Sequence, residues 1–177
     1  TLKKKQRYDL IIVDWKMPVM TGAMMLDAIR GDRQLRDLPV IMVTAESQKD
    51  IVLDIAEIEV EGYLLKPLTP ALLEDKIRAV VEKVNNPDDA TRHARKAREC
   101  QDNGNIELAI RHMEMAVKHK PSASRLVRNV GLLHVQEGNM ALAEKYLKDA
   151  AFVNSQDAIT RHHLCQFYWK AEDYSKA

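Results

Sequence analysis

Three polar residues of this chain, an aspartate, a threonine and a lysine, stand at the ends of short apolar runs. Asp14 follows the run 10–13, Thr44 ends the run 38–44, and Lys66 comes near the end of the run 62–67. Runs without polar alternation are typical of strands that are buried on both faces of a parallel sheet. Ligands bind at the carboxyl edge of such sheets. If the three strands are neighbours, these side chains converge on one small space.

A carboxylate, a hydroxyl and an ammonium group in one place are what an acyl phosphate requires. The Asp14 carboxylate would be the nucleophile that takes the phosphoryl group. The Thr44 hydroxyl would hydrogen-bond one phosphoryl oxygen, and the Lys66 charge would meet another. Such a transfer depends mainly on positioning and charge neutralisation, and it uses Mg²⁺, which prefers oxygen ligands. We therefore predict phosphoryl transfer to Asp14 with Mg²⁺ as cofactor.

At these residues the chain resembles the receiver domain of bacterial two-component response regulators. The resemblance implies that Asp14 is the phospho-acceptor, Thr44 the switch hydroxyl and Lys66 the phosphate-binding lysine. It also implies an α/β doubly wound, flavodoxin-like fold over residues 1–86. The expected partner is a sensor histidine kinase or a phosphotransfer protein.

The resemblance extends to the residues around the acceptor. It implies that the backbone carbonyl of Lys16 is a metal ligand together with Asp14, and that Tyr63 is the aromatic switch residue. The segment 17–22, MPVMTG, looks like the loop after the acceptor. Haloacid-dehalogenase-like phosphatases also use an aspartate nucleophile, but they require a second aspartate two residues later. Lys16 occupies that position and excludes them.

Taken singly, each of these residues has an ordinary explanation. An aspartate at a strand end more often caps a helix or forms a turn than it attacks a substrate. The joint spacing of acid, hydroxyl and amine is what favours the phospho-acceptor hypothesis.

Between and after the strands, apolar residues recur at helical spacing. This predicts helices over 21–30 and 48–58, and a further helix over 71–84 that Thr69 and Pro70 open as N-cap and first helical residue. The residues predicted to face the core are Met24, Met25, Ala28 and Ile29 in the first helix, and Leu72, Leu73, Ile77, Val80, Val81 and Val84 in the last.

The expected topology places part of the receiver outside the chain. In the strand order 2-1-3-4-5, the run before Asp14 is the third strand, which the first strand should flank. We expect about 40 to 50 further residues before Thr1, including the acidic pair that completes the family's Mg²⁺ site, or a second chain that supplies these strands. We assign 1–86 to an incomplete receiver, 87–89 to a linker and 90–177 to a second domain.

Composition sets the remaining limits. The chain has 177 residues, of which 46% are hydrophobic and 30% charged, as in soluble domains. A net charge of +1 gives no reason to expect nucleic-acid or membrane binding, and no apolar run is long enough to span a bilayer. Cys100 and Cys165 suit a reducing cytosol and are expected to be buried thiols. We expect a cytoplasmic location.

Residues 90–177 contain a 34-residue repeat, which predicts an all-α solenoid of two-helix units. Small residues that let helices approach closely recur at this period: Gly104 and Gly138, Ala109 and Ala143, Ala116 and Ala150, and Ala97, Gly131 and Cys165. The pattern resembles the tetratricopeptide repeat, in units 90–123, 124–157 and 158 onward, with the third unit cut short at Ala177. It departs from that family at His93, Val127 and Ser155.

The second resemblance implies a groove for a protein or peptide ligand, lined by the first helix of each unit. Its charged and aromatic residues would be Arg98, Arg125, Arg128, Asn129 and Trp169. The arginines suggest a mildly acidic ligand, although such residues often only face solvent. The other predicted lining residues are Ala94, Gln101, Leu132, Gln136, His162 and Gln166.

Metal binding in this second domain is not expected. Adjacent residues such as His162 and His163 point about 100° apart on a helix. His112 and His119 lack a third ligand at a suitable spacing.

The predicted function is that of a response regulator, a phospho-acceptor signalling protein rather than an enzyme, whose receiver controls a protein contact made by the repeats. Two alternatives stay open. The receiver would never be phosphorylated and would serve as a scaffold, or the repeats would act as an adaptor or co-chaperone with the receiver forming a dimer. The sequence names neither the kinase nor the ligand.

Overall fold

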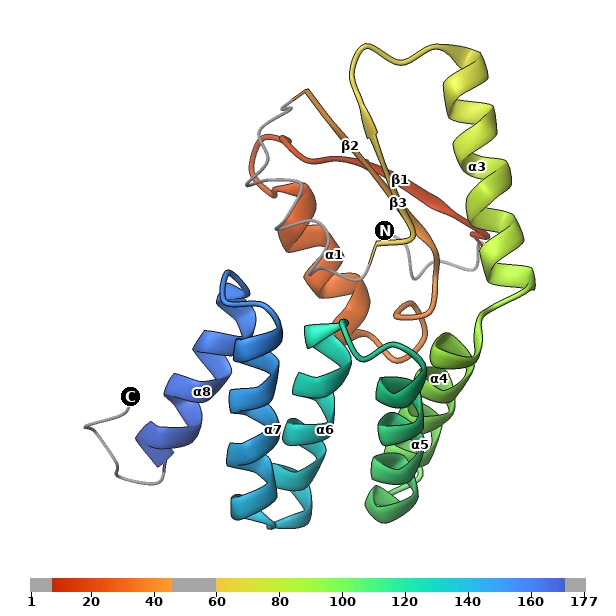
Figure 1. Cartoon of the computed structure of the whole chain (residues 1–177). Helices are drawn as coiled ribbons and strands as arrows, with labels where there is room; N and C mark the ends of the chain where they lie inside the picture. The colour runs from red at the N-terminus through yellow and green to blue at the C-terminus, as the bar shows by residue number, and fades with distance from the viewer. Residues whose placement is uncertain (1–7, 46–59, 171–177) are drawn as a thin grey trace. The chain divides into compact units, whose positions relative to one another are not determined.

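A computed structural model of the chain describes residues 8–45 and 60–170. The chain divides into two compact units, Thr1–Asn86 and Pro87–Ala177. The first unit combines strands and helices, and the second is helical (Figure 1). None of the helices within the described ranges has both the length and the apolar character that a membrane span needs.

The first unit contains a three-stranded parallel sheet in the order β1-β2-β3. Its strands are β1 (Ile11–Asp14), β2 (Val40–Thr44) and β3 (Gly62–Leu65). Asp14 pairs with Val43, and Thr44 pairs with Leu65. The strands predicted before Asp14, up to Thr44 and up to Lys66 are therefore confirmed, and their carboxyl ends lie at one edge.

Two helices, α1 (Gly22–Gly31) and α3 (Pro70–Asn85), pack on opposite faces of this sheet. The cluster on the α1 side contains Ile11, Val13, Leu26, Ile29, Val40 and Met42. The cluster on the α3 side contains Ile41, Val43, Leu64 and Val80. Each fully buried side chain of this size stabilises the fold by about 1.5 to 3 kcal/mol. The predicted parallel sheet with helices on both faces is confirmed.

Both helices begin after a threonine N-cap, of which Thr69 was predicted, while Thr21 was predicted as a residue inside its helix. The Thr21 hydroxyl accepts a hydrogen bond from the Met24 backbone N–H, at 3.2 Å. The Thr69 hydroxyl accepts one from the Leu72 backbone N–H, also at 3.2 Å, and Pro70 is the first residue of α3. These bonds satisfy N–H groups that have no partner inside the helix.

Several predicted core positions are wrong. β2 is buried along its length, but Ile12 of β1 is 44% exposed, because α3 packs over β2 and β3 rather than over the β1 edge. Met24 is 56% exposed, since the sheet-facing side of α1 is formed by Gly22, Leu26 and Ile29. Leu72 and Val81 of α3 are also exposed. The predicted helix 48–58 lies outside the described residues.

A half-buried arginine that the sequence did not single out ties α1 to the sheet. Arg30 donates to the carbonyl oxygens of Arg36 and Leu38, both at 2.9 Å, and to Glu61 Oε2 at 3.1 Å. Glu61 Oε2 also accepts from the Val40 backbone N–H at 2.7 Å. The pair thus joins the end of α1 to the starts of β2 and β3.

The second unit is built from helices that alternate with short turns. They are α4 (Asp89–Asp102), α5 (Ile106–His119), α6 (Ser124–Glu137), α7 (Met140–Val153) and α8 (Ala158–Lys170). The turns repeat after 34 residues, since Gly104 and Gly138 both have a positive φ, of 77° and 87°. Asn105 and Asn139 then cap α5 and α7 through their side chains. The prediction that this unit is all-α is therefore confirmed.

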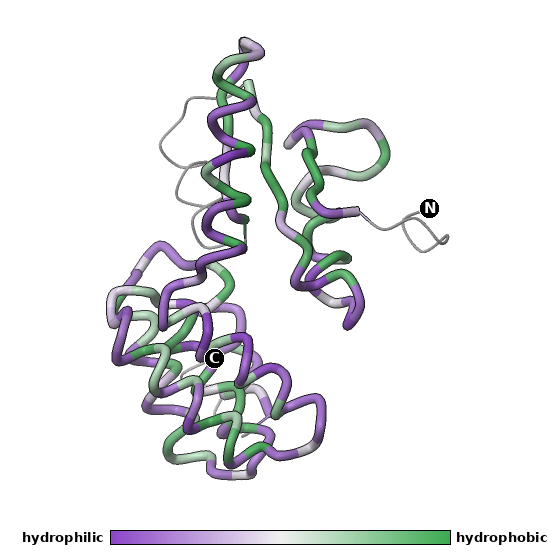
Figure 2. Tube along the Cα trace, turned by 90° about the vertical axis from the view of Figure 1, so that its right-hand side faces the viewer, coloured by the Kyte–Doolittle hydropathy of each residue, from purple (hydrophilic) through white to green (hydrophobic). Residues whose placement is uncertain are grey.

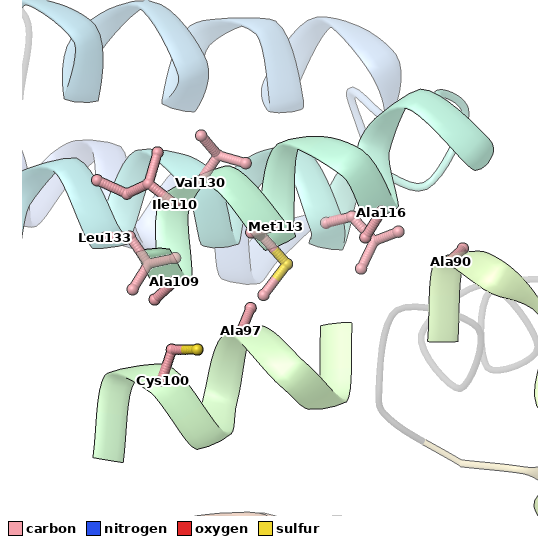
Figure 3. Packing of buried hydrophobic residues seen from close by; sticks show 10 residues of the cluster. Ala90, Ala97, Cys100, Ala109, Ile110, Met113, Ala116, Val130 and Leu133 are labelled. Atoms are coloured by element: carbon pink, nitrogen blue, oxygen red, sulfur yellow. The ribbon is translucent and has the colours of Figure 1, made fainter. Parts of the chain in front are cut away.

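Small residues hold these helices close together. Figure 3 shows Ala97 of α4 pointing toward Met113 of α5, and both belong to one buried cluster with Ala109. A Cβ added at Gly131 would lie 3.0 Å from Leu147 Cγ, so α6 and α7 approach closely there. Hydrophilic and hydrophobic residues alternate along the helices, as amphipathic packing requires (Figure 2).

The two cysteines differ in their exposure to solvent. Cys100 is buried, as predicted, but Cys165 is exposed. In the first two hairpins the equivalent positions, Ala97 and Gly131, are covered by the second helix of the same hairpin. The residues that follow α8 lie outside the described part of the chain.

Candidate functional site

The carboxylate of Asp14 and the ammonium group of Lys66 are in direct contact at the carboxyl edge of the sheet. Asp14 ends β1, and Lys66 follows β3 and precedes a cis peptide bond to Pro67. The two side chains are 34% and 43% exposed, so the contact is open to solvent and to a reactant. The structure therefore brings together two residues that are 52 positions apart in the sequence.

The environment of Asp14 favours its charged form. The hydrogen bond from Lys66 is the main cause that lowers the pKa of Asp14, and the partial burial of the carboxyl opposes it. The backbone N–H of Lys16 also donates to Asp14 Oδ1 at 3.2 Å. The carboxylate is therefore ionised at neutral pH, as a nucleophile must be.

Thr44 ends the central strand, between the strands that carry Asp14 and Lys66. Its side chain is buried, and its carbonyl oxygen accepts from the Lys66 backbone N–H at 2.8 Å. The neighbouring Val43 carbonyl accepts from the Trp15 backbone N–H at 2.7 Å. These bonds continue the strand pairing one residue past β1 and β3 and so fix the positions of Asp14 and Lys66.

The loop between β1 and α1 is shaped by two unusual backbone positions. Val19 has φ 72° and is fully exposed, a strained conformation for a β-branched residue. A Cβ at Gly22 would clash with the Asp14 carbonyl oxygen and lie 3.0 Å from Met42 Sδ. Only a glycine therefore lets the start of α1 pack this close to the site.

Tyr63 lies on β3, three residues before Lys66. Its ring is partly exposed, and the Lys76 ammonium group lies 5.8 Å from the ring centroid. The side chain is thus at the protein surface in this state.

The described residues supply two of the predicted Mg²⁺ donors, the Asp14 carboxylate and the Lys16 carbonyl. Both are oxygen atoms of the kind Mg²⁺ prefers, and they would supply part of the ligand set that this ion needs. Across 8–45 and 60–170, no group of three or more His, Cys, Asp or Glu side chains is placed to hold a metal ion.

In the helical unit, one residue that was predicted to line the groove, Arg128, is buried instead. Arg98, Arg125 and Asn129 are half-buried on α4 and α6, and Trp169 of α8 is exposed. Arg128 is instead buried, and its guanidinium lies 2.8 Å from Asp157 Oδ2. It is therefore not available to a ligand in a groove.

Asp157 connects the second hairpin to α8. Its Oδ1 accepts from the Thr160 backbone N–H at 3.0 Å, and the Thr160 hydroxyl and Arg128 donate to its Oδ2. Burial works to raise the pKa of Asp157, but the hydrogen bonds from Thr160 and the Arg128 charge outweigh it and lower the pKa. Removing one partner of such a buried pair typically costs about 3 to 5 kcal/mol.

Three histidines meet between α4 and α5, and sequence reasoning missed one of them. His93 Nδ1 lies 3.1 Å from His112 Nδ1, and the His93 ring stacks on His119 with centroids 5.8 Å apart. Burial, with the His93 and Lys96 charges, lowers the pKa of His112. His93 has no helical spacing to the other two, so only the hairpin packing reveals the cluster.

Comparison with known proteins concerns the unit that contains Asp14. Residues 1–78 match the response regulator receiver domain family. The chain is 45% identical over 78 residues to the chemotaxis protein CheY of Pseudomonas aeruginosa, which covers 44% of this chain and 63% of that protein. It is 40% identical over 81 residues to the chemotaxis protein CheY-3 of Vibrio cholerae, and this alignment covers 46% of this chain and 62% of that protein.

Among solved structures, the chain aligns with the bacteriophytochrome response regulator RtBRR at 27% identity and a TM-score of 0.40, over 44% of this chain and 47% of that one. The chain thus spans less than two thirds of the length of each of these proteins. The sequence matches place a CheY-like receiver domain in the segment that carries Asp14, Thr44 and Lys66.

We expect Lys66→Gln to raise the pKa of Asp14 toward its ordinary value near 3.8, because the main cause of the lowering is removed. The titration is followed through the carboxyl-carbon chemical shift of Asp14. Lys16→Gln is the matched control, since Lys16 acts on Asp14 through its backbone N–H. The assignment of Lys66 as the controlling charge is wrong if both variants titrate like the original protein.

We expect Gly22→Ala to lower the free energy of unfolding of the first unit by about 1 to 3 kcal/mol, because the added Cβ has no space. Gly31→Ala at the other end of α1 is the control. A Cβ there meets nothing within 4 Å, so this change should stabilise by up to about 1 kcal/mol. Urea unfolding followed by Trp15 fluorescence in a Trp169→Phe background measures both, and equal effects would contradict the close approach.

Proposed function

We propose that this chain is part of a two-component response regulator in which Asp14 accepts a phosphoryl group. The observation that carries the proposal is the contact of the Asp14 carboxylate with the Lys66 ammonium group at the carboxyl edge of a parallel sheet. The same segment matches the receiver family and the CheY proteins. The phosphoryl donor would be a sensor histidine kinase or a phosphotransfer protein.

The proposed reaction needs few groups. A carboxylate oxygen of Asp14 attacks the phosphorus of a phosphohistidine, the P–N bond breaks, and the imidazole leaves with the electron pair and takes up a proton. The Lys66 ammonium group then balances charge on a phosphoryl oxygen, and the Thr44 hydroxyl donates to another. The Asp14 carboxylate and the Lys16 carbonyl would hold Mg²⁺, whose charge would neutralise further phosphoryl charge.

The helical unit is proposed to be the output. Its 34-residue period, its capped turns at Asn105 and Asn139, and its small residues at helix crossings support a tetratricopeptide-like array. Arrays of stacked hairpins present extended surfaces that suit protein partners. Phosphorylation would regulate this contact by a population shift in which Thr44 and Tyr63 take part.

The test is the intact mass of the protein after incubation with Mg²⁺ and acetyl phosphate. We expect one added phosphoryl group, absent in Asp14→Asn because an amide is no nucleophile. Asp9→Asn, which alters an exposed carboxylate five residues away, should still be modified. A folded protein that gains no mass, or an Asp14→Asn variant that gains as much as the original, would refute the proposal.

A further inference from the structure

A pocket of about 220 Å³ lies where α8 packs on the hairpin of α6 and α7. Its wall is mainly apolar, and its polar residues all come from α8. The lining residues are Leu132, Val135, Met140, Leu147, His163, Gln166, Phe167 and Lys170. Leu132 and Gln166 are also residues of the predicted groove, so the pocket lies on the surface proposed to bind a partner.

In the corresponding junction of the first hairpin with α6, 34 residues earlier, two polar side chains meet. There Gln101 donates a hydrogen bond to Gln136 at 2.9 Å and joins α4 to α6. The equivalent residues in the second junction are Val135 and Lys170, which cannot form this bond. Arg98, whose long side chain is half-buried in the first junction, is replaced by the shorter Leu132.

Apolar residues at equivalent positions stand in both junctions. Met113 and Leu133 belong to the buried cluster of the first junction. Their equivalents, Leu147 and Phe167, line the pocket of the second. The pocket therefore lies at the junction where Val135 and Lys170 replace the glutamine pair and Leu132 replaces Arg98.

The charged residue among those that line the pocket is Lys170. Within its 13 residues α8 carries Arg161 and Lys170 and no carboxylate. Lys170 lines the pocket, and no ion pair joins it to another of the described residues. Burial is the main cause that lowers the pKa of His163, and the Arg128 charge adds to it. The His163 ring in the pocket wall is therefore neutral at pH 7.

We propose that this pocket receives a large apolar side chain, such as Leu, Met or Phe, from an acidic peptide segment of a partner protein, with a neighbouring carboxylate on Lys170. This inference rests on the proposed role of the helical unit as a protein-binding output. The size is suitable, because an apolar cavity of about 150 Å³ already holds benzene. A side chain that fills such a pocket, ringed by polar contacts, is the usual form of a binding hot spot.

The test uses fluorescein-labelled synthetic decapeptides and fluorescence anisotropy. Each peptide has a central Phe, Leu, Met or Ala, flanked by either Glu or Lys residues. We expect Phe or Leu between glutamates to bind at least about 10-fold more tightly than Ala, as filling a hydrophobic pocket predicts. The lysine-flanked peptides should bind more weakly than their glutamate-flanked counterparts.

The decisive variant copies the glutamine pair of the first junction onto the second. Val135→Gln combined with Lys170→Gln should form the bond seen between Gln101 and Gln136 and abolish the preference for Phe over Ala. Lys170→Gln alone should lose the preference for glutamate flanks and keep the preference for Phe. Lys118→Gln, the same charge change on an exposed residue of α5, should alter neither. Circular dichroism confirms that each variant is helical.

Peptides that bind the double variant as tightly as the original protein would overturn the proposal, and so would a protein that binds none of them. Binding of decanoate in place of any peptide would equally overturn it, in favour of a small-molecule site. The acetyl phosphate experiment is independent of these results. A protein that is phosphorylated on Asp14 but ignores the peptides would leave phosphoryl transfer standing and refute only the pocket.

Discussion

The parallel pairing of three short strands is the constraint on which the candidate site depends. Asp14 and Lys66 lie 52 residues apart in the sequence. Their strands, β1 and β3, are not neighbours in the sheet, because β2 lies between them. The central strand sets both positions, because Trp15 bonds to the Val43 carbonyl on one side and Lys66 to the Thr44 carbonyl on the other. Parallel strands place like ends together. The charge pair is therefore a consequence of strand register, and the helices act by burying the faces of the sheet.

The helical unit follows a different rule, in which the same contacts recur every 34 residues. Glycine turns, asparagine caps and small residues at crossings make the hairpins similar. The differences between repeats then carry the specific features. Asp157, which has Ala123 as its equivalent one period earlier, anchors α8 through Arg128 and Thr160. Val135 and Lys170, which stand where Gln101 and Gln136 stand one period earlier, line a pocket at the next junction.

Much of the fold follows from the sequence because its signals are local. Apolar runs predicted the strands, and Thr69 with Pro70 predicted the start of α3. The exposure of single side chains was harder to predict. Ile12 and Met24 are apolar residues of the kind found in cores, but they lie where none of the described elements covers them. Contacts between distant polar residues carried no local signal. The Arg30–Glu61 pair, the Arg128–Asp157 pair and the His93 cluster depend on tertiary packing, and so Arg128 was wrongly placed in the groove.

The central claim is that Asp14 itself forms the acyl phosphate, and borohydride reduction of the phosphorylated protein tests it most directly. Reduction converts an aspartyl phosphate to homoserine, which peptide mass spectrometry locates in the sequence. The account predicts homoserine at position 14 and an unchanged residue at Asp9. Homoserine at another aspartate, or none in a protein that carries a phosphoryl group, would contradict it.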